Sequence, residues 1–360
     1  MSSSGTSPAW SHTPSSPRTC WPGEECAPPP LFHRPARPRR SNRMSVIVGA
    51  YATAPRPIES TAQFDRYVAD VLSLPGVAGL EVPYQNPESP WNDIGYLTST
   101  STSSTHVLTL IPALVSALAS SPRLGLASVD DDGRRAALEL VRGAHRFVQD
   151  VNAKGGGAFT HVELHSSPRR QDASADALRR SLDEIATWDW GPVSLTIEHC
   201  DADTGAHEPA KGFLPLDDEI AVARERGLGM VLNWGRSAIE ARDAAGAARH
   251  VDTAVAAGVL TGVVFSGASP EPSAYGPGWG DWHLPIRAWG TGPVAAEAAT
   301  SLLTPAEVAD CVARATAAPE LAFVGVKVAP PSFATVPQRV ELLAANLAIV
   351  AGAVAQARDA

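Results

Sequence analysis

Apolar segments of strand length alternate with amphipathic segments of helical length from residue 44 to the end of the chain. The strand-length segments are rich in Val, Ile and Leu, and the stretches between them follow a helical period. This alternation is typical of β–α units whose strands form a parallel sheet. Eight strands are predicted, at residues 45–50, 78–82, 106–111, 160–165, 192–198, 228–233, 259–266 and 321–328, with 123–128 as a continuation of the third.

Helix start and stop signals support this interpretation independently of the strand count. Thr304 is followed by a proline and then by Glu307, which is the pattern of a capping box with proline in the first turn. Residues 335–338 repeat it. Gly227 and Gly258 follow predicted helix ends, where a left-handed residue is favoured.

Eight strands, each followed by a helix, predict a (β/α)8 barrel over residues 44–360. Two long loops interrupt the repeat, at 83–105 and 267–303. A doubly wound sheet is the alternative, and it would usually have a glycine-rich phosphate loop after its first strand. Residues 49–53 are no such loop, and the glycine run at 155–157 is typical of a linker.

The first 43 residues have a different composition, with nine prolines, eight serines and six arginines. Such a segment cannot bury enough apolar surface to order itself, so we predict a disordered extension, or a true start at Met44. Arg39-Arg40 and Ala52-Thr53-Ala54 resemble a twin-arginine export signal. Its apolar region is shorter than the expected 7–15 residues or so, and cleavage would remove the first strand. A cytoplasmic protein is therefore expected.

Composition excludes several classes of protein. The 360 residues include 29 basic and 38 acidic side chains, and the net charge of −9 offers no basic face for a nucleic acid. With 44% hydrophobic residues and a mean hydropathy of −0.05, the chain can bury a large core without supplying a membrane span. The four cysteines, at 20, 26, 200 and 311, follow no paired spacing and support neither a disulfide framework nor a zinc ribbon.

Polar residues stand at inward positions near the ends of six predicted strands. Period-2 alternation puts the apolar residues of each strand against the helices and its other residues inside the barrel. The inward set forms a ring of Glu81, Glu163, His165, Glu198, Asn233, Ser266 and Lys327. Buried charges are costly unless they are paired, so this ring predicts a functional site at the C-terminal face. A self-contained ion-pair network is the alternative.

Lys327 is unusual because the chain has three lysines against 26 arginines. An inward lysine therefore indicates a need for a compact ammonium group. It could pair with Glu198 or Glu163, hold a substrate carboxylate or phosphate, act as a base, or form a Schiff base.

The loop at 267–303 adds the candidate substrate-binding residues Trp279, Asp281 and His283. Tryptophans on such a loop stack against sugars, close a lid, or anchor the loop to the barrel. Metal ligands are available in number, although no linear spacing confirms a site and one of them, His199, alternates outward. They are His165, Glu198, His199, Asp281 and His283.

Motifs around the strand-end glutamates resemble the xylose isomerase-like TIM-barrel superfamily of sugar isomerases, epimerases and related endonucleases. These motifs lie at residues 79–83, 162–165 and 195–198. The turns at 165–168 and 266–268 resemble an uncharacterised bacterial domain family even more closely. The resemblance covers roughly the whole chain from residue 44 and implies a TIM barrel.

In metal-dependent members of the superfamily, Glu, Asp, His and Glu from strands 5 to 8 commonly hold a divalent ion. Glu198 matches the first position, but Asn233, Ser266 and Lys327 occupy the others, so the usual ligand set is not preserved and a metal stays open. Arg236 stands where a histidine often follows and suggests an anionic substrate group. The endonuclease branch needs several metals and a basic groove, which this acidic chain lacks.

Together these observations predict an isomerase or epimerase that moves a proton next to the carbonyl of a sugar or sugar acid. Glu198 or Glu163 is the predicted base, and the other carboxylate or His165 returns the proton. Lys327 and Arg236 would replace the metal in stabilising the enediolate. The alternatives are a lyase or aldolase that uses Lys327, and a non-catalytic carbohydrate-binding barrel. The expected partner is a small carbohydrate, and the resemblance allows a homo-oligomer.

Overall fold

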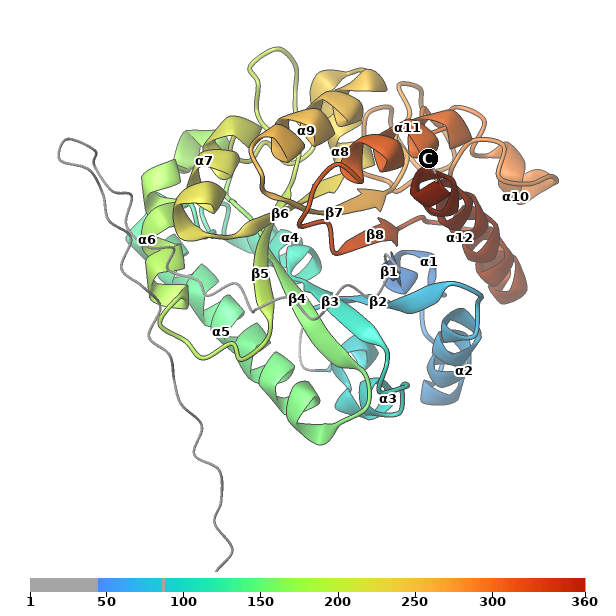
Figure 1. Ribbon diagram of the computed structural model, residues 1–360, viewed down its shortest axis with the longest axis horizontal. Coiled ribbons are helices and arrows are strands. Elements are labelled where there is room, and N and C mark those ends of the chain that lie inside the picture. Colours follow the sequence, from blue (N-terminus) through green and yellow to red (C-terminus); the bar gives the residue numbers. More distant parts are fainter. Residues whose placement is uncertain (1–44, 86–87, 360) are drawn as a thin grey trace, which may run out of the picture. The chain divides into compact units, whose positions relative to one another are not determined.

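Eight parallel strands close into a barrel in the order of the sequence, with the last strand paired to the first (Figure 1). The computed structural model describes residues 45–85 and 88–359, so the predicted extension at 1–43 lies outside the described residues. The closed barrel of eight strands confirms the predicted (β/α)8 fold. Its strands are β1 (Ser45–Val48), β2 (Val77–Pro83), β3 (Thr105–Thr109), β4 (Ala158–Leu164), β5 (Ser194–His199), β6 (Gly229–Asn233), β7 (Leu260–Phe265) and β8 (Phe323–Val326).

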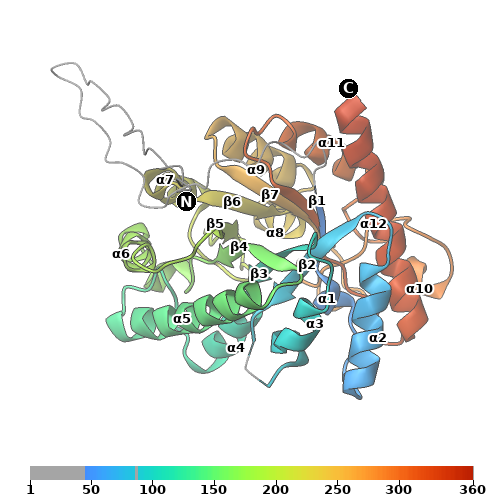
Figure 2. The same cartoon turned by 60° about the horizontal axis from the view of Figure 1, so that its bottom comes forward.

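Helices follow the strands and surround the barrel (Figures 1 and 2). Two short 3-10 helices lie in the connections, at Pro90–Asn92 and Arg170–Asp172. The α-helices are α1 (Ala50–Thr53), α2 (Thr61–Leu72), α3 (Ile94–Thr98), α4 (Ile111–Ser120), α5 (Asp131–Lys154), α6 (Ala175–Ile185), α7 (Leu216–Arg226), α8 (Trp234–Ala241), α9 (Ala245–Ala256), α10 (Pro293–Ala296), α11 (Pro305–Ala315) and α12 (Val336–Asp359).

The predicted helix signals are present. Thr304 and Glu307 form the reciprocal capping box at the start of α11. At the start of α12, the backbone N–H of Thr335 donates to the Gln338 side chain at 2.9 Å. Gly227 and Gly258 take φ values of 73° and 71°, in the left-handed region that favours glycine.

Several predicted strands were too long, since β3 ends at Thr109 rather than at residue 111 and β8 spans Phe323–Val326 rather than 321–328. The first strand ends at Val48, because the chain turns directly into α1. Residues 123–128 are no strand, and only Ser128 makes an isolated bridge, to Ala173. This segment crosses close to the chain after β4, because a Cβ at Gly125 would lie 2.0 Å from the Ser167 carbonyl oxygen.

A small apolar cluster fills the barrel interior beneath the strand ends. The inward alternation of β8 continues upward from Phe323 through Gly325 to Lys327, so the apolar cluster and the polar ring belong to one set of inward positions. Both levels are closed to solvent, since the cluster members are at most 3% exposed and the ring residues at most 2%. The cluster consists of Ile47, Val107, Val231, Val264 and Phe323.

The two long loops have different roles in packing. In the first, Trp91 and Tyr96 pack edge-on against Phe64 of α2, with ring centroids 4.9 and 5.1 Å away, so these aromatic rings anchor the loop. The second, residues 267–303, is called the β7 loop below. Gly267 and Leu284 exchange backbone hydrogen bonds, so the first part of the β7 loop folds back to the end of β7.

Helix α12 is long and apolar enough to cross a membrane by length and composition alone. It also packs on the barrel, against β8, α2 and α11, and buries Leu342, Leu343 and Leu347. One such helix is weak evidence for a membrane span. Strand β1 pairs with both β2 and β8, so cleavage after Ala54 would open the barrel. The expectation against export cleavage agrees with this arrangement, and cytoplasmic localisation stays a prediction.

Candidate active site

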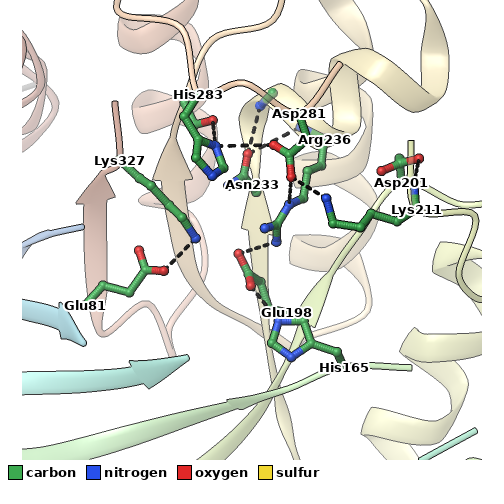
Figure 3. A network of polar contacts seen from close by, with 12 residues as sticks. Glu81, His165, Glu198, Asp201, Lys211, Asn233, Arg236, Asp281, His283 and Lys327 are labelled. Atoms are coloured by element: carbon green, nitrogen blue, oxygen red, sulfur yellow. Dashed lines mark hydrogen bonds and ion pairs between the residues drawn. The ribbon is translucent and has the colours of Figure 1, made fainter. Parts of the chain in front are cut away.

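The seven residues of the predicted ring lie buried at the C-terminal ends of the strands. Each is at most 2% exposed, and strand alternation turns their side chains into the barrel. Figure 3 shows how residues of this ring meet side chains of the β5–α7 and β7 loops. The ring consists of Glu81, Glu163, His165, Glu198, Asn233, Ser266 and Lys327.

Glu198, at the end of β5, lies between a cation and an imidazole. Its Oε1 is 2.7 Å from Nη1 of Arg236, and its Oε2 is 2.7 Å from Nε2 of His165 (Figure 3). Burial on its own would raise the pKa of Glu198, but Arg236, Lys327 and the His165 hydrogen bond hold it well below its usual range. Glu198 is therefore an ionised carboxylate.

His165 is neutral and orients the Glu198 carboxylate. Burial lowers the pKa of His165, although the hydrogen bond and charge of Glu198 oppose this. Because a carboxylate can only accept, Nε2 of His165 carries the proton and donates it to Glu198. The other nitrogen, Nδ1, is buried without a hydrogen-bond partner among the described residues.

Lys327 forms an ion pair with Glu81 across the barrel. Its Nζ lies 2.6 Å from Oε1 of Glu81, and the Tyr51 hydroxyl donates to the same oxygen at 3.1 Å. Burial would lower the pKa of Lys327, but Glu81, Tyr51 and Glu198 raise it well above its ordinary value. The predicted pairing with a glutamate thus occurs, with Glu81 rather than with Glu198 or Glu163 as the partner.

Glu163, at the end of β4, lacks the polar contacts that Glu198 and Glu81 make among the described residues. Neither of its carboxyl oxygens has a hydrogen-bond partner within the part of the chain that the structure describes. Burial raises the pKa of Glu163 well above the usual range, and the charges of Glu198 and Glu81 raise it further. Glu163 is therefore a protonated acid. A buried polar group without a partner is rare and often marks a functional site.

The β7 loop is fastened over the ring by Asp281. Oδ2 of Asp281 accepts from Nε of Arg236 at 3.1 Å and from Nζ of Lys211 at 2.7 Å. Its Oδ1 is 3.3 Å from Nδ1 of His283, which is also 2.9 Å from Oγ of Ser266. Burial would raise the pKa of Asp281, but Lys211, His283 and Arg236 hold it well below its usual range. Arg236 thus joins the loop to Glu198.

The remaining predicted substrate-binding residues also have intramolecular partners in this arrangement. Oδ1 of Asn233 accepts from the backbone N–H groups of Gly235 and Arg236, so Asn233 is the N-cap of α8. The Arg242 guanidinium lies 4.9 Å from the Trp279 ring centroid, which anchors that part of the loop. Arg236 is 1% exposed between the carboxylates of Glu198 and Asp281, which balance its charge in this closed arrangement.

Sequence reasoning missed Tyr51 and Lys211. Tyr51 was overlooked because the predicted first strand ran into α1, which directs its hydroxyl to Glu81. Lys211 lies in the loop between β5 and α7, and its backbone N–H donates to Asp201 at 2.8 Å. The rarity of lysine, which drew attention to Lys327, could also have identified Lys211.

The donor set at the ends of β5 to β8 does not fit the divalent ion implied by the superfamily. Lys327 and Arg236 place two positive charges beside Glu198. Oδ1 of Asn233 is engaged by two backbone N–H groups, and Lys327 offers no lone pair as an ammonium. A dication would meet repulsion and too few oxygen or imidazole donors.

Comparisons with known proteins agree with the fold and the predicted resemblance. Residues 47–342 match the family described as Domain of unknown function (DUF4862). An uncharacterized protein of Salmonella typhimurium (strain LT2) is 34% identical over 295 residues, which is 79% of this chain and 90% of that protein.

Two solved barrels show the same fold at low identity. A D-tagatose 3-epimerase-like protein has a TM-score of 0.51 and 13% identity, covering 86% of this chain and 99% of that one. A D-psicose 3-epimerase, crystallised in the presence of D-fructose, has a TM-score of 0.50 and 12% identity, covering 87% and 99%. These two likenesses therefore show the TIM-barrel fold.

Proposed function

The chain belongs to the DUF4862 family, and from its site we propose that it isomerises or epimerises a sugar or sugar acid by proton transfer next to a carbonyl group. One observation carries the proposal. Two buried glutamates at the ends of the neighbouring strands β4 and β5, Glu163 and Glu198, have pKa values displaced in opposite directions. Such a pair supplies one acid and one base at the same pH.

In the proposed reaction Glu198 is the base. Its Oε1 lies 2.7 Å from Nη1 of Arg236, but the two atoms do not meet hydrogen-bond geometry, so the oxygen keeps a lone pair available. It accepts the proton from the carbon next to the carbonyl, and the C–H electron pair moves to form the enediolate. His165 acts as a positioning residue, because its N–H fixes the other carboxylate oxygen.

Glu163 supplies the returning proton. Its carboxyl O–H gives a proton to the opposite face of the same enediolate carbon, which restores the carbonyl and completes an epimerisation. In an isomerisation the proton goes to the former carbonyl carbon, and the hydroxyl proton on the neighbouring carbon moves to the former carbonyl oxygen, so that the carbonyl group forms at that neighbouring carbon. Glu163 is then ionised and Glu198 protonated, and exchange with solvent resets both groups. The reaction needs no oxidant, reductant or second substrate.

Lys327 and Arg236 stabilise the negative charge of the enediolate. Both are cations in a site closed to water, where electrostatic interactions are stronger than in solvent. The ion pair with Glu81 keeps Lys327 protonated, which opposes the lyase or aldolase alternative, because imine formation needs a neutral amine.

Substrate entry requires displacement of the β7 loop. The acid, the base and both cations are at most 1% exposed, and Asp281 holds the loop through Arg236 and Lys211. Loops that close over barrel sites commonly exclude water in this way. The names of the two similar epimerases make D-tagatose, D-psicose and D-fructose the first sugars to test, followed by sugar acids.

Deuterium exchange tests the proposal directly. The full chain is incubated with each sugar in D2O, and NMR follows loss of the proton on the carbon next to the carbonyl. We expect exchange with the natural chain and at least about a 100-fold loss of exchange in Glu198→Gln, the usual scale for removing a base. In Glu163→Gln we expect a similar loss of product formation in the same spectra, because Glu198 can still exchange the proton that it removes. Glu341→Gln, on the exposed face of α12, is the matched control and keeps the natural rate.

A folded Glu198→Gln protein that exchanges at the natural rate, or a folded Glu163→Gln protein that forms product at the natural rate, would refute the assignment. Saturable sugar binding without any exchange would favour the non-catalytic carbohydrate-binding barrel. Borohydride reduction of a mixture with substrate, followed by mass spectrometry, is expected to leave Lys327 unmodified.

A further inference from the structure

We propose that His199, Glu240 and His250 bind a divalent transition metal ion of the zinc class, at a site outside the barrel and separate from the ring. His199 is the outward neighbour of Glu198 on β5, whereas Glu240 lies on α8 and His250 on α9. The site does not depend on the proposed isomerase function, because none of its three residues takes part in that reaction.

The three side chains converge on a space that suits one ion. Nε2 of His199 is 3.0 Å from Oε2 of Glu240, and Nε2 of His250 is 3.6 Å from Oε1 of the same carboxylate. One ligand atom from each residue lies within 4.8 Å of the other two. Tetrahedral zinc with bonds of about 2.0–2.1 Å separates its ligand atoms by about 3.3 Å, which these spacings approach.

Both imidazoles are oriented as metal-binding histidines usually are. Nδ1 of His199 lies 2.6 Å from Oε2 of Glu219, and Nδ1 of His250 lies 3.0 Å from Oγ of Ser237. Each ring therefore has an acceptor for its Nδ1 proton and turns Nε2 toward Glu240. Although burial lowers the pKa of His199, Glu219 and Glu240 raise it to about 10, so a bound ion displaces the Nε2 proton that His199 donates to Glu240. Carboxylate or hydroxyl partners of this kind fix the tautomer and ring orientation of metal ligands.

The ligand types select the class of ion. Two imidazoles and one carboxylate suit zinc and similar transition metals, whereas magnesium and calcium prefer oxygen ligands. The side chain of His199 is fully buried, but those of Glu240 and His250 are 11% and 15% exposed, which leaves a route for the ion and a position for a water ligand. Three protein ligands plus water complete a tetrahedron.

An ion at this position would join β5, α8 and α9. Helix α8 also carries Arg236, one helical turn before Glu240, so the metal site and the ring share one supporting helix. Binding to the folded chain alone would stabilise it in proportion to the logarithm of free metal concentration.

Metal binding by the full chain provides the test. The protein is stripped with a chelator, dialysed, and titrated with zinc by calorimetry, and elemental analysis then gives the stoichiometry. Cobalt is used as a spectroscopic probe of coordination. We expect one equivalent of zinc, a raised melting temperature, and the visible absorption of four-coordinate cobalt.

Three variants locate the site. His250→Gln removes a ligand and is expected to weaken zinc binding by more than about 100-fold, since changes in supporting residues alone cost about 10–100-fold. Ser237→Ala keeps all three ligands and should weaken binding by about 10-fold, which also serves if His250→Gln fails to fold. His145→Gln, on α5, is the control and should bind as the natural chain does.

Either of two results would overturn the proposal. Absence of a saturable zinc equivalent in the natural chain, or unchanged zinc affinity in both His250→Gln and Ser237→Ala, would show that this cluster is only a hydrogen-bonded brace. Loss of proton exchange in Glu198→Gln with zinc binding intact would separate this site from the ring.

Discussion

Three buried glutamates in one barrel mouth have three different environments. Glu81 pairs with Lys327, Glu198 with Arg236, and Glu163 has no hydrogen-bond partner among the described residues. The same side chain is therefore ion-paired in two places and a neutral acid in the third. At the residue scale, the partner of each carboxyl group decides its chemistry.

The raised pKa of Glu163 predicts a specific pH dependence of stability. The folded chain keeps a proton that the unfolded chain releases above about pH 4.5, so this contribution is complete below that pH. It is lost as pH rises through the folded-state pKa, at up to about 1.4 kcal/mol per pH unit. The glutamine side chain of Glu163→Gln resembles a protonated glutamate and does not ionise, so this variant does not lose that part of its free energy of unfolding as pH rises.

Urea unfolding between pH 4 and pH 9 measures the effect. The free energy of unfolding of Glu163→Gln should rise relative to that of the natural chain as pH increases. Glu341→Gln should follow the natural chain throughout. A constant difference between Glu163→Gln and the natural chain across this range would mean that Glu163 is ionised in the folded state.

At the scale of a single element, helix α8 positions side chains in both the ring and the proposed metal site. It begins at the Asn233 cap, directs Arg236 into the ring, and presents Ser237 and Glu240 to the histidine cluster. Because the cap fixes where the helix begins, it also fixes the rotation of Arg236 relative to Glu198. Asn233 therefore contributes through the helix that it starts.

Removal of two helix caps tests this role of α8. Asn233→Ala and Thr304→Ala each remove one N-cap and should each lower the free energy of unfolding by about 0.5–2 kcal/mol in urea titrations. Only Asn233→Ala should also slow proton exchange on the substrate, because α11 carries none of the ring residues. Equal exchange rates in the two variants would contradict a positioning role for the cap.

At the scale of the whole molecule, one carboxylate connects two loops across the barrel mouth. Asp281 of the β7 loop contacts Lys211 of the β5–α7 loop and Arg236 of α8. Its side chain is 7% exposed, so these contacts are shielded from solvent. Asp281 thus links the two loops through two cations, Lys211 and Arg236, whereas burial lowers the pKa of its third neighbour, His283, to about 3.

Asp281→Ala should loosen both loops together. Loss of the shared carboxylate leaves Lys211 and Arg236 without this partner, and buried charges that lose a partner are destabilising. Hydrogen exchange followed by mass spectrometry should show faster exchange in residues 270–283 and in residues 201–212. Asp310→Ala removes an exposed ion pair on α11 and is the control. Faster exchange confined to one loop would contradict the coupling.

Much of the fold and part of the site could be predicted from local patterns. The number of strands and the inward direction of the ring follow from periodicity over a few residues. Helix caps follow from residue types at fixed spacing. A sequence contains both kinds of information directly. Tyr51 was missed because the end of β1 was misplaced by two residues. The intramolecular partners of Trp279 and Arg236 could not be predicted, because a sequence does not show which distant side chains come together.

The sequence by itself determined a (β/α)8 barrel with ionisable groups gathered at one end. Only the tertiary structure decided how those groups pair, because the partners are far apart in the chain. Lys327 and Glu81 are separated by 246 positions, and Lys211 and Asp281 by 70. Burial and neighbouring charge then set each protonation state. These depend on distances in space, which closure of the barrel and the course of its loops establish.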